Sequence, residues 1–176
     1  MASQAHPEIA PTDTELLQAQ ADLWRHSLCY LTSMALKCAV ELGIPTAIYR
    51  LGGTTSLPSL TTELSIPQSK LPYLGRLMRF LASSWVFTAN TSTGQATYGL
   101  NLQSKLLVDG IALDGDAHQK AIVLTTTSRY YVDAVLGLAS RFKDTPPPLK
   151  SSFEDLHGAT LFEDSVPGSG ISQAIK

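Results

Sequence analysis

Apolar residues recur at helical spacing in the middle of the chain, and the other elements are arranged around this stretch. Five of them follow one another at i, i+3, i+6, i+7 and i+10, which places them along one side of an α-helix over residues 67–84. The stripe consists of Leu71, Leu74, Leu77, Met78 and Leu81.

A shorter helix is predicted just before this one. Ser56 is a suitable N-cap, and Pro58 stands early, where a missing N–H costs little. The short turn 65–67 then joins the two helices. After the second helix, residues 85–88 and 96–100 read as two strands around the polar turn 90–94. The order helix, turn, helix, hairpin is that of a winged helix-turn-helix.

The N-terminal part predicts a long helix that becomes almost wholly apolar. Thr12 or Asp13 caps its start, and Gly43 ends the apolar stretch. A helix that is apolar on most sides is buried on most sides, and a chain of this size has few other elements that could pack around it. We therefore expect a partner subunit to cover it. The predicted dimer-interface residues are Leu28, Leu31, Met34, Ala35 and Leu42.

The C-terminal third predicts further helices. Residues 102–107 form a short apolar piece, and residues 116–143 read as one long helix that ends before three consecutive prolines. Another helical turn is expected at 152–158. The Gly- and Ser-rich stretch 164–176 is expected to be a loose tail, and the polar residues 1–11 a flexible N-terminus. The fold class is therefore mainly α, with a small hairpin and a long C-terminal helix.

Composition narrows the function. The 176 residues are 44% hydrophobic and 16% charged, so a real core is possible. Neither a secretory signal nor a run of about 18 apolar residues is present, so we expect a cytoplasmic protein without membrane contact.

The residues that could carry chemistry form no recognisable site. The Cys29 and Cys38 thiols are expected to be reduced, and the four histidines are scattered along the sequence. We predict no catalytic, cofactor-binding or metal-binding residue.

Nucleic-acid binding is the main alternative for a winged helix. The central helix carries Lys70, Arg76 and Arg79 between its apolar positions. However, the formal net charge is −2, and the predicted wing at 90–95 has no Lys or Arg to contact phosphate. These features favour a winged helix used as a scaffold, without a nucleic-acid partner.

Three linked segments carry a family resemblance. Residues 34–45, residues 67–81 and the Tyr-Gly-Leu of 98–100 resemble the N-terminal dimerisation domain of plant O-methyltransferases of the caffeic acid and flavonoid type. Residues 153–163 are similar to that family's bridge into its catalytic domain. The likeness implies a winged-helix homodimer or a heterodimer with a relative, formed by residues 12–110. It also implies that residues 111–163 are a helical linker that lines the acceptor site.

The same resemblance implies site residues and a cofactor. Met34 and Cys38 match positions that line the partner subunit's acceptor pocket in similar enzymes. The family binds S-adenosylmethionine on a following Rossmann-like domain, and the likeness stops near residue 164. We therefore expect this chain to bind no cofactor itself and to be a truncated product, a shortened gene model or a stand-alone dimerisation module.

Three hypotheses follow. The first is the dimerisation and acceptor-lining domain of a plant-type O-methyltransferase for phenolic or other small acceptors, inactive alone. The second is a winged-helix DNA-binding regulator. The third is a regulatory partner that pairs with full-length relatives and lowers their activity.

Overall fold

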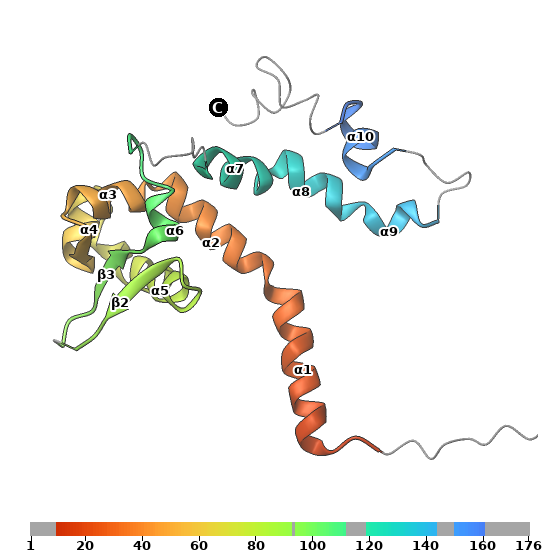
Figure 1. Ribbon diagram of the computed structural model, residues 1–176, viewed down its shortest axis with the longest axis horizontal. Helices are drawn as coiled ribbons and strands as arrows, with labels where there is room; N and C mark the ends of the chain where they lie inside the picture. The colour runs from red at the N-terminus through yellow and green to blue at the C-terminus, as the bar shows by residue number, and fades with distance from the viewer. Residues whose placement is uncertain (1–9, 93, 112–118, 144–149, 161–176) are drawn as a thin grey trace, which may run out of the picture.

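The computed structural model describes residues 10–92, 94–111, 119–143 and 150–160, and these are mainly helical (Figure 1). The elements of the N-terminal half are α1 (Asp13–Leu28), α2 (Tyr30–Glu41), α3 (Ile44–Arg50), β1 (Thr54–Ser56), α4 (Leu57–Glu63), the 3₁₀ turn η1 (Gln68–Lys70) and α5 (Leu71–Ser83). The remaining elements are β2 (Phe87–Asn90), β3 (Thr97–Leu100), α6 (Leu102–Lys105), α7 (Gln119–Thr126), α8 (Arg129–Leu136), α9 (Leu138–Arg141) and α10 (Ser152–His157).

The winged helix-turn-helix is confirmed. Ser56 caps α4 by accepting a hydrogen bond from the Ser59 N–H, and Pro58 lies in the first turn. Ser65, with φ of 53°, turns the chain between α4 and α5. A second left-handed residue, Trp85 with φ of 62°, directs the chain from α5 into β2. A left-handed backbone is uncommon outside glycine, so both positions fix sharp changes of direction.

The sheet contains a strand that the sequence analysis missed. It is antiparallel, with the order β1-β3-β2, so β3 is central. The predicted hairpin β2–β3 is present, and β1 adds to its other edge by pairing Thr54 with Gly99. Gly99 is needed there, because a Cβ would lie 2.7 Å from Thr88 Oγ1 and 2.9 Å from Thr54 Oγ1.

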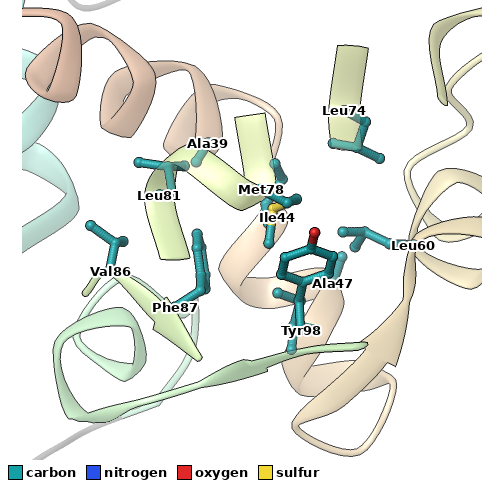
Figure 2. Close-up of a cluster of buried hydrophobic side chains, with 11 residues drawn as sticks. Ala39, Ile44, Ala47, Leu60, Leu74, Met78, Leu81, Val86, Phe87 and Tyr98 are labelled. Atoms are coloured by element: carbon teal, nitrogen blue, oxygen red, sulfur yellow. The ribbon is translucent and has the colours of Figure 1, made fainter. Parts of the chain in front are cut away.

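One hydrophobic core joins α3, α4, α5 and the sheet (Figure 2). The predicted stripe of α5 supplies Leu74, Met78 and Leu81, which are at most 4% exposed. Phe87 and Tyr98 reach the same core from β2 and β3. All of these core side chains come from a single chain.

The N-terminal helices extend from this unit (Figure 1). Thr12 and Glu15 form a capping box, so the predicted start of α1 is confirmed. The long helix is interrupted at Cys29, whose φ of −59° and ψ of −26° remain helical. No residue of α1 is buried, whereas Ala39 and Val40 of α2 are. The arm is therefore anchored only through α2.

The predicted continuous helix over residues 116–143 is divided into three. Breaks fall at Thr127–Ser128 and at Gly137, which separate α7, α8 and α9. Ser128 ends one helix and starts the next, because its side chain accepts a hydrogen bond from the Tyr131 N–H. The Lys37 ammonium of α2 donates to the Thr127 carbonyl at 3.2 Å, which ties this break to the N-terminal half.

Several sequence-based expectations fall outside the described residues. These are the flexible residues 1–9, the prolines at 146–148 and the tail 164–176. Among the described residues no single helix has the length and apolar composition of a membrane span. The bent pair formed by residues 13–41 and α3, at 52°, meets those criteria of length and composition when its two parts are taken together.

Candidate dimer interface and adjoining groove

The predicted interface residues lie on the surface of the single chain, along α1 and α2. Leu28, Leu31 and Leu42 are 50%, 42% and 41% exposed. Met34 is 36% exposed and Ala35 is half-buried. Apolar side chains farther along α1 are also exposed, namely Leu16, Leu17, Leu23 and Trp24. The described chain therefore leaves a long apolar surface uncovered, as expected of a face that meets a partner.

A groove continues this surface onto the winged unit. It has a volume of about 310 Å³ and lies between the C-terminal half of α2 and the start of α5. Its walls are largely apolar. The lining residues are Cys38, Leu42, Ile66, Lys70, Tyr73, Leu74 and Leu77. Periodicity predicted Leu74 and Leu77 as helix-face residues, but only the fold brings them beside α2.

The rim of the groove is aromatic and basic. Tyr73 is 61% exposed, and the Lys70 Nζ and Arg76 Cζ lie 5.3 and 5.7 Å from the centre of its ring. Such cation–π contacts hold the charged groups beside the ring. Together with Arg79, these are the cations that the sequence analysis considered for DNA. The structure does not test DNA binding, and its predicted absence stays a prediction.

Met34 and Cys38 are one turn apart on α2, so both face the same side of the helix. Met34 lies on the exposed surface, and Cys38 lines the groove. Burial raises the pKa of the Cys38 thiol, and the nearby Glu41 carboxylate raises this pKa further. The thiol therefore stays protonated and packs as a small apolar group. The acceptor-lining role implied for both residues is not tested by this geometry.

A second pocket, which the sequence analysis did not identify, lies between α8 and α10. Its volume is about 510 Å³, and its walls include Tyr131, Ala134 and Phe153. Beside it, His157 stacks on the Tyr130 ring at 3.6 Å, and its Nε2 lies 2.9 Å from the Tyr130 carbonyl oxygen. The sequence analysis did not identify this pocket because α8 and α10 lie apart in the sequence, with α9 between them.

The described residues contain no obvious catalytic or metal centre. No group of three or more His, Cys, Asp or Glu side chains among them is placed to hold a metal ion. In the same part of the chain, no buried side-chain polar atom lacks a hydrogen-bond partner. The predicted absence of catalytic, cofactor and metal residues in this chain remains a prediction.

Comparison with known proteins identifies the family. Residues 24–110 match the family model of the O-methyltransferase dimerisation domain. The chain is 58% identical over 172 residues to probable O-methyltransferase 2 of Sorghum bicolor, with 94% of this chain and 46% of that protein covered. It is 55% identical over 177 residues to a flavonoid O-methyltransferase-like protein of Oryza sativa subsp. japonica, with 94% and 47% covered.

A solved structure supports the fold. The crystal structure of human N-acetylserotonin methyltransferase in complex with SAM superposes with a TM-score of 0.60 at 16% identity, covering 82% of this chain and 36% of that one. The chain thus spans about half the length of the curated relatives it matches. We conclude that the chain belongs to the plant-type O-methyltransferase family and carries its dimerisation domain at residues 24–110.

Proposed function

We propose that this domain pairs two copies of the chain through the exposed apolar face of α1 and α2. The dimer brings together two acceptor-binding regions of a SAM-dependent O-methyltransferase that acts on phenolic small molecules. The cofactor and acceptor are suggested by the named relatives, one solved with SAM and one flavonoid O-methyltransferase-like. We place the protein in the cytoplasm, which a fluorescent fusion tests directly.

The observation that carries the proposal is that α1 has no buried residue although it carries four leucines and a tryptophan. Burying one such side chain is worth about 1.5–3 kcal/mol. The described chain offers this helix no cover, because the core of the winged unit is already filled by its own residues. A second copy with the same face provides the missing cover.

Within this proposal, Met34 and Cys38 contribute to the wall of an acceptor pocket. Support comes from their place at the junction between the exposed face and the groove. Residues 111–163 contribute a second apolar wall, because α8 and α10 enclose a pocket of about 510 Å³. An acceptor pocket with aromatic and aliphatic walls suits a phenolic ring.

The direct test of pairing is the oligomeric state. Wild-type protein is expected to elute as a dimer in size-exclusion chromatography with light scattering. Leu31→Asp is expected to be monomeric, since it places a charge in the middle of the apolar face. Leu102→Asp is the control, because Leu102 is 75% exposed on α6 and should leave the dimer intact. A dimeric Leu31→Asp protein would disprove the assigned face.

A second experiment tests whether this chain alone is an enzyme. The sheet formed by the described residues is antiparallel and has three strands, unlike a parallel nucleotide-binding sheet. We therefore expect no heat of binding when SAM is titrated into the 176-residue protein. Saturable binding would contradict this part of the proposal and leave the dimer untouched.

The regulatory hypothesis uses the same face. Since the chain is 58% identical to one half of a longer relative, the corresponding domain of such a relative could replace the second copy. Co-expression with a tagged full-length relative is expected to yield mixed dimers that Leu31→Asp abolishes. Recovery of homodimers alone would exclude this role.

A further inference from the structure

A further pocket lies on the winged unit, where α5 packs against β2 (Figure 1). Its volume is about 600 Å³, within the range of about 300–1,000 Å³ that is usual for small-molecule sites. Its mainly apolar walls come from α4, α5, β2 and β3 and from the N-cap of α6. This wing pocket, as we call it, shares no lining residue with the groove beside α2 or with the pocket between α8 and α10. Its walls include Leu57, Arg79, Trp85, Phe87, Tyr98 and Asn101.

Trp85 combines high exposure with an unusual backbone conformation. It is 80% exposed and has a φ of 62°. It stands where the chain leaves α5, and its N–H donates to the Ala82 carbonyl at 3.1 Å, while the next N–H, of Val86, donates to the Leu81 carbonyl at 2.9 Å. A helix that ends with this pair of bonds normally has glycine at this place, because a bulky residue is strained at positive φ. Here the strained position carries the largest side chain that a protein has, and it faces solvent.

The side chain of Asn101 holds Trp85 in place. Asn101 Nδ2 donates to the Trp85 carbonyl oxygen at 2.6 Å. The same amide group accepts a hydrogen bond from the Ser104 N–H at 3.0 Å and thereby caps α6. Strained residues that the surrounding structure fixes in this way are found preferentially at binding sites. The start of α6 thus fixes the backbone that presents the indole ring at the wing pocket.

Arg79 is the charged residue of the wing pocket. Among the described residues, no Asp or Glu lines this pocket, and none forms an ion pair with Arg79, whereas Arg129 and Arg141 each pair with an aspartate. Its Nη1 lies 3.7 Å, and Leu57 Cδ1 3.2 Å, from the place that a Cβ on Gly75 would occupy. The guanidinium therefore lies beside an apolar side chain and, in this part of the chain, has no carboxylate to balance its charge.

We propose that the wing pocket binds a small aromatic carboxylate. The guanidinium of Arg79 pairs with the carboxylate, which its planar fork matches with two parallel hydrogen bonds. The aromatic ring of the ligand packs against the indole of Trp85, and Leu57 adds an aliphatic contact. This proposal concerns a surface other than the face of α1 and α2, so it does not depend on the proposed dimer.

The surroundings of the wing pocket favour a carboxylate over a phosphate group. Arg79 is its one cation among the described residues, and a single positive charge balances a monoanion. The pocket also borders the last turns of α5, where Ala82 and Ser83 line it. The C-terminal end of a helix carries partial negative charge and disfavours a dianion.

The aromatic walls favour a planar ligand. Phe87 and Tyr98 close the inner side of the wing pocket, and their rings belong to the hydrophobic core (Figure 2). They are 2% and 1% exposed, so they form a fixed floor. Trp85 is the exposed ring, and a flat ligand covers more of its apolar surface than a branched aliphatic one of equal size.

The test follows the two indole N–H signals of the ¹⁵N-labelled 176-residue protein by NMR. The chain contains only Trp24 and Trp85, so the spectrum holds one reporter at the wing pocket and one internal control on α1. On addition of 2-naphthoate, the Trp85 signal should shift saturably with a dissociation constant on the order of 1 mM or tighter. The Trp24 signal should stay in place. Neutral 2-naphthamide has nearly the same shape and should bind at least about ten-fold more weakly, because it cannot pair with the guanidinium.

Arg79→Gln and Arg76→Gln are matched variants. Both residues are exposed on α5 and each variant removes one positive charge, but Arg76 lies beside Tyr73, outside the wing pocket. Arg79→Gln should weaken binding of 2-naphthoate at least about ten-fold, and Arg76→Gln less than about two-fold. Trp85→Gly suits the left-handed backbone, so the protein should stay folded. Saturation transfer from this variant to the ligand protons should be lost.

Four results would each overturn the proposal. They are the absence of a saturable shift at Trp85, equal binding of the amide, wild-type binding by Arg79→Gln, and equal shifts of both indole signals, which indicate non-specific association. If 2-naphthoate does not bind but Trp85→Gly changes the oligomeric state in light scattering, the same face is a contact between copies of the chain, and the proposed ligand site is wrong. All of these results leave the Leu31→Asp test of the dimer unaffected.

Discussion

Thr46 and Asp109 exchange hydrogen bonds in both directions. The Asp109 N–H donates to Thr46 Oγ1 at 3.0 Å, and the Thr46 hydroxyl donates to the Asp109 carboxylate at 3.2 Å. Thr46 is 8% exposed on α3, and Asp109 follows α6. One hydroxyl thus serves as acceptor and donor and fixes the exit of the chain from the winged unit.

Thr46→Val removes this exchange while keeping the shape of the side chain. We expect a loss of about 1–3 kcal/mol in unfolding free energy, because a backbone N–H is left without its partner. Urea unfolding followed by circular dichroism measures it. Thr62→Val is the control, since the exposed Thr62 hydroxyl donates to the Pro58 carbonyl of its own helix, and its loss should cost less than about 0.5 kcal/mol. Equal losses for both variants would refute the role of the exchange.

The Asp109 carboxylate also predicts a pH dependence. The hydrogen bond from the Lys120 ammonium, at 2.9 and 3.0 Å, is the main cause that lowers the pKa of Asp109 below its usual value. Because the pKa of Asp109 is lower in the folded state, its ionised carboxylate stabilises the fold. This stabilisation is present above about pH 4 and is lost as the pH falls through the folded-state pKa. Both side chains are more than a third exposed, so the contribution is below about 1 kcal/mol.

The stabilisation by the ion pair is measured by comparing the unfolding free energies of the wild type and Asp109→Asn. The comparison covers pH 2–7, roughly the range over which a carboxylate titrates. The difference should be largest near neutral pH and shrink towards zero in acid. A difference that stays constant, or grows as the pH falls, would show that the ion pair does not stabilise the fold.

Two glycines form a matched pair for testing the sheet. Gly99→Ala places a Cβ against Thr88 and Thr54 in the central strand and should cost about 1–3 kcal/mol. Gly137→Ala meets nothing closer than 3.9 Å at ordinary backbone angles and should be neutral or stabilise by up to about 1 kcal/mol. Thermal unfolding ranks the two variants. If Gly99→Ala is as stable as the wild type, β3 is not held between its neighbours as described.

The contact between the Lys37 ammonium and the Thr127 carbonyl predicts a local effect. Lys37→Met should leave the core around Met78 intact, because Lys37 lies outside it. Amide hydrogen exchange should become faster in α7 and at the start of α8, with little change in α5. Lys105→Met, at an exposed position on α6, serves as control. Uniform acceleration across the chain would instead indicate general destabilisation.

Elements with a strong repeating pattern could be predicted from the sequence. The stripe of α5 and the cap at Ser56 located the helix pair, and alternating residues around the polar turn located β2 and β3. Strand β1 has three polar residues and no pattern of its own, since pairing with β3 creates it. The C-terminal helix over residues 116–143 was predicted unbroken, whereas Ser128 caps α8 and so divides it.

The site was predictable only in part. The exposed leucines of α1 and α2 follow from an excess of apolar residues, which composition and spacing reveal. The groove could not be predicted from the sequence, because Ile66 and Leu77 approach Cys38 only after α5 packs against α2. The pocket between α8 and α10 likewise depends on a return of the chain that no local pattern specifies.

Helix α1 has no buried residue, so its stability should depend on the protein concentration at which the sample is handled. Isolated helices of this length are marginal in water, so its helical content should depend on how much protein is present. Dilution should unravel the arm while the winged unit keeps its structure. The sample would then look partly unstructured in a nanomolar assay and fully ordered in a crystallisation drop, with no change of buffer or temperature.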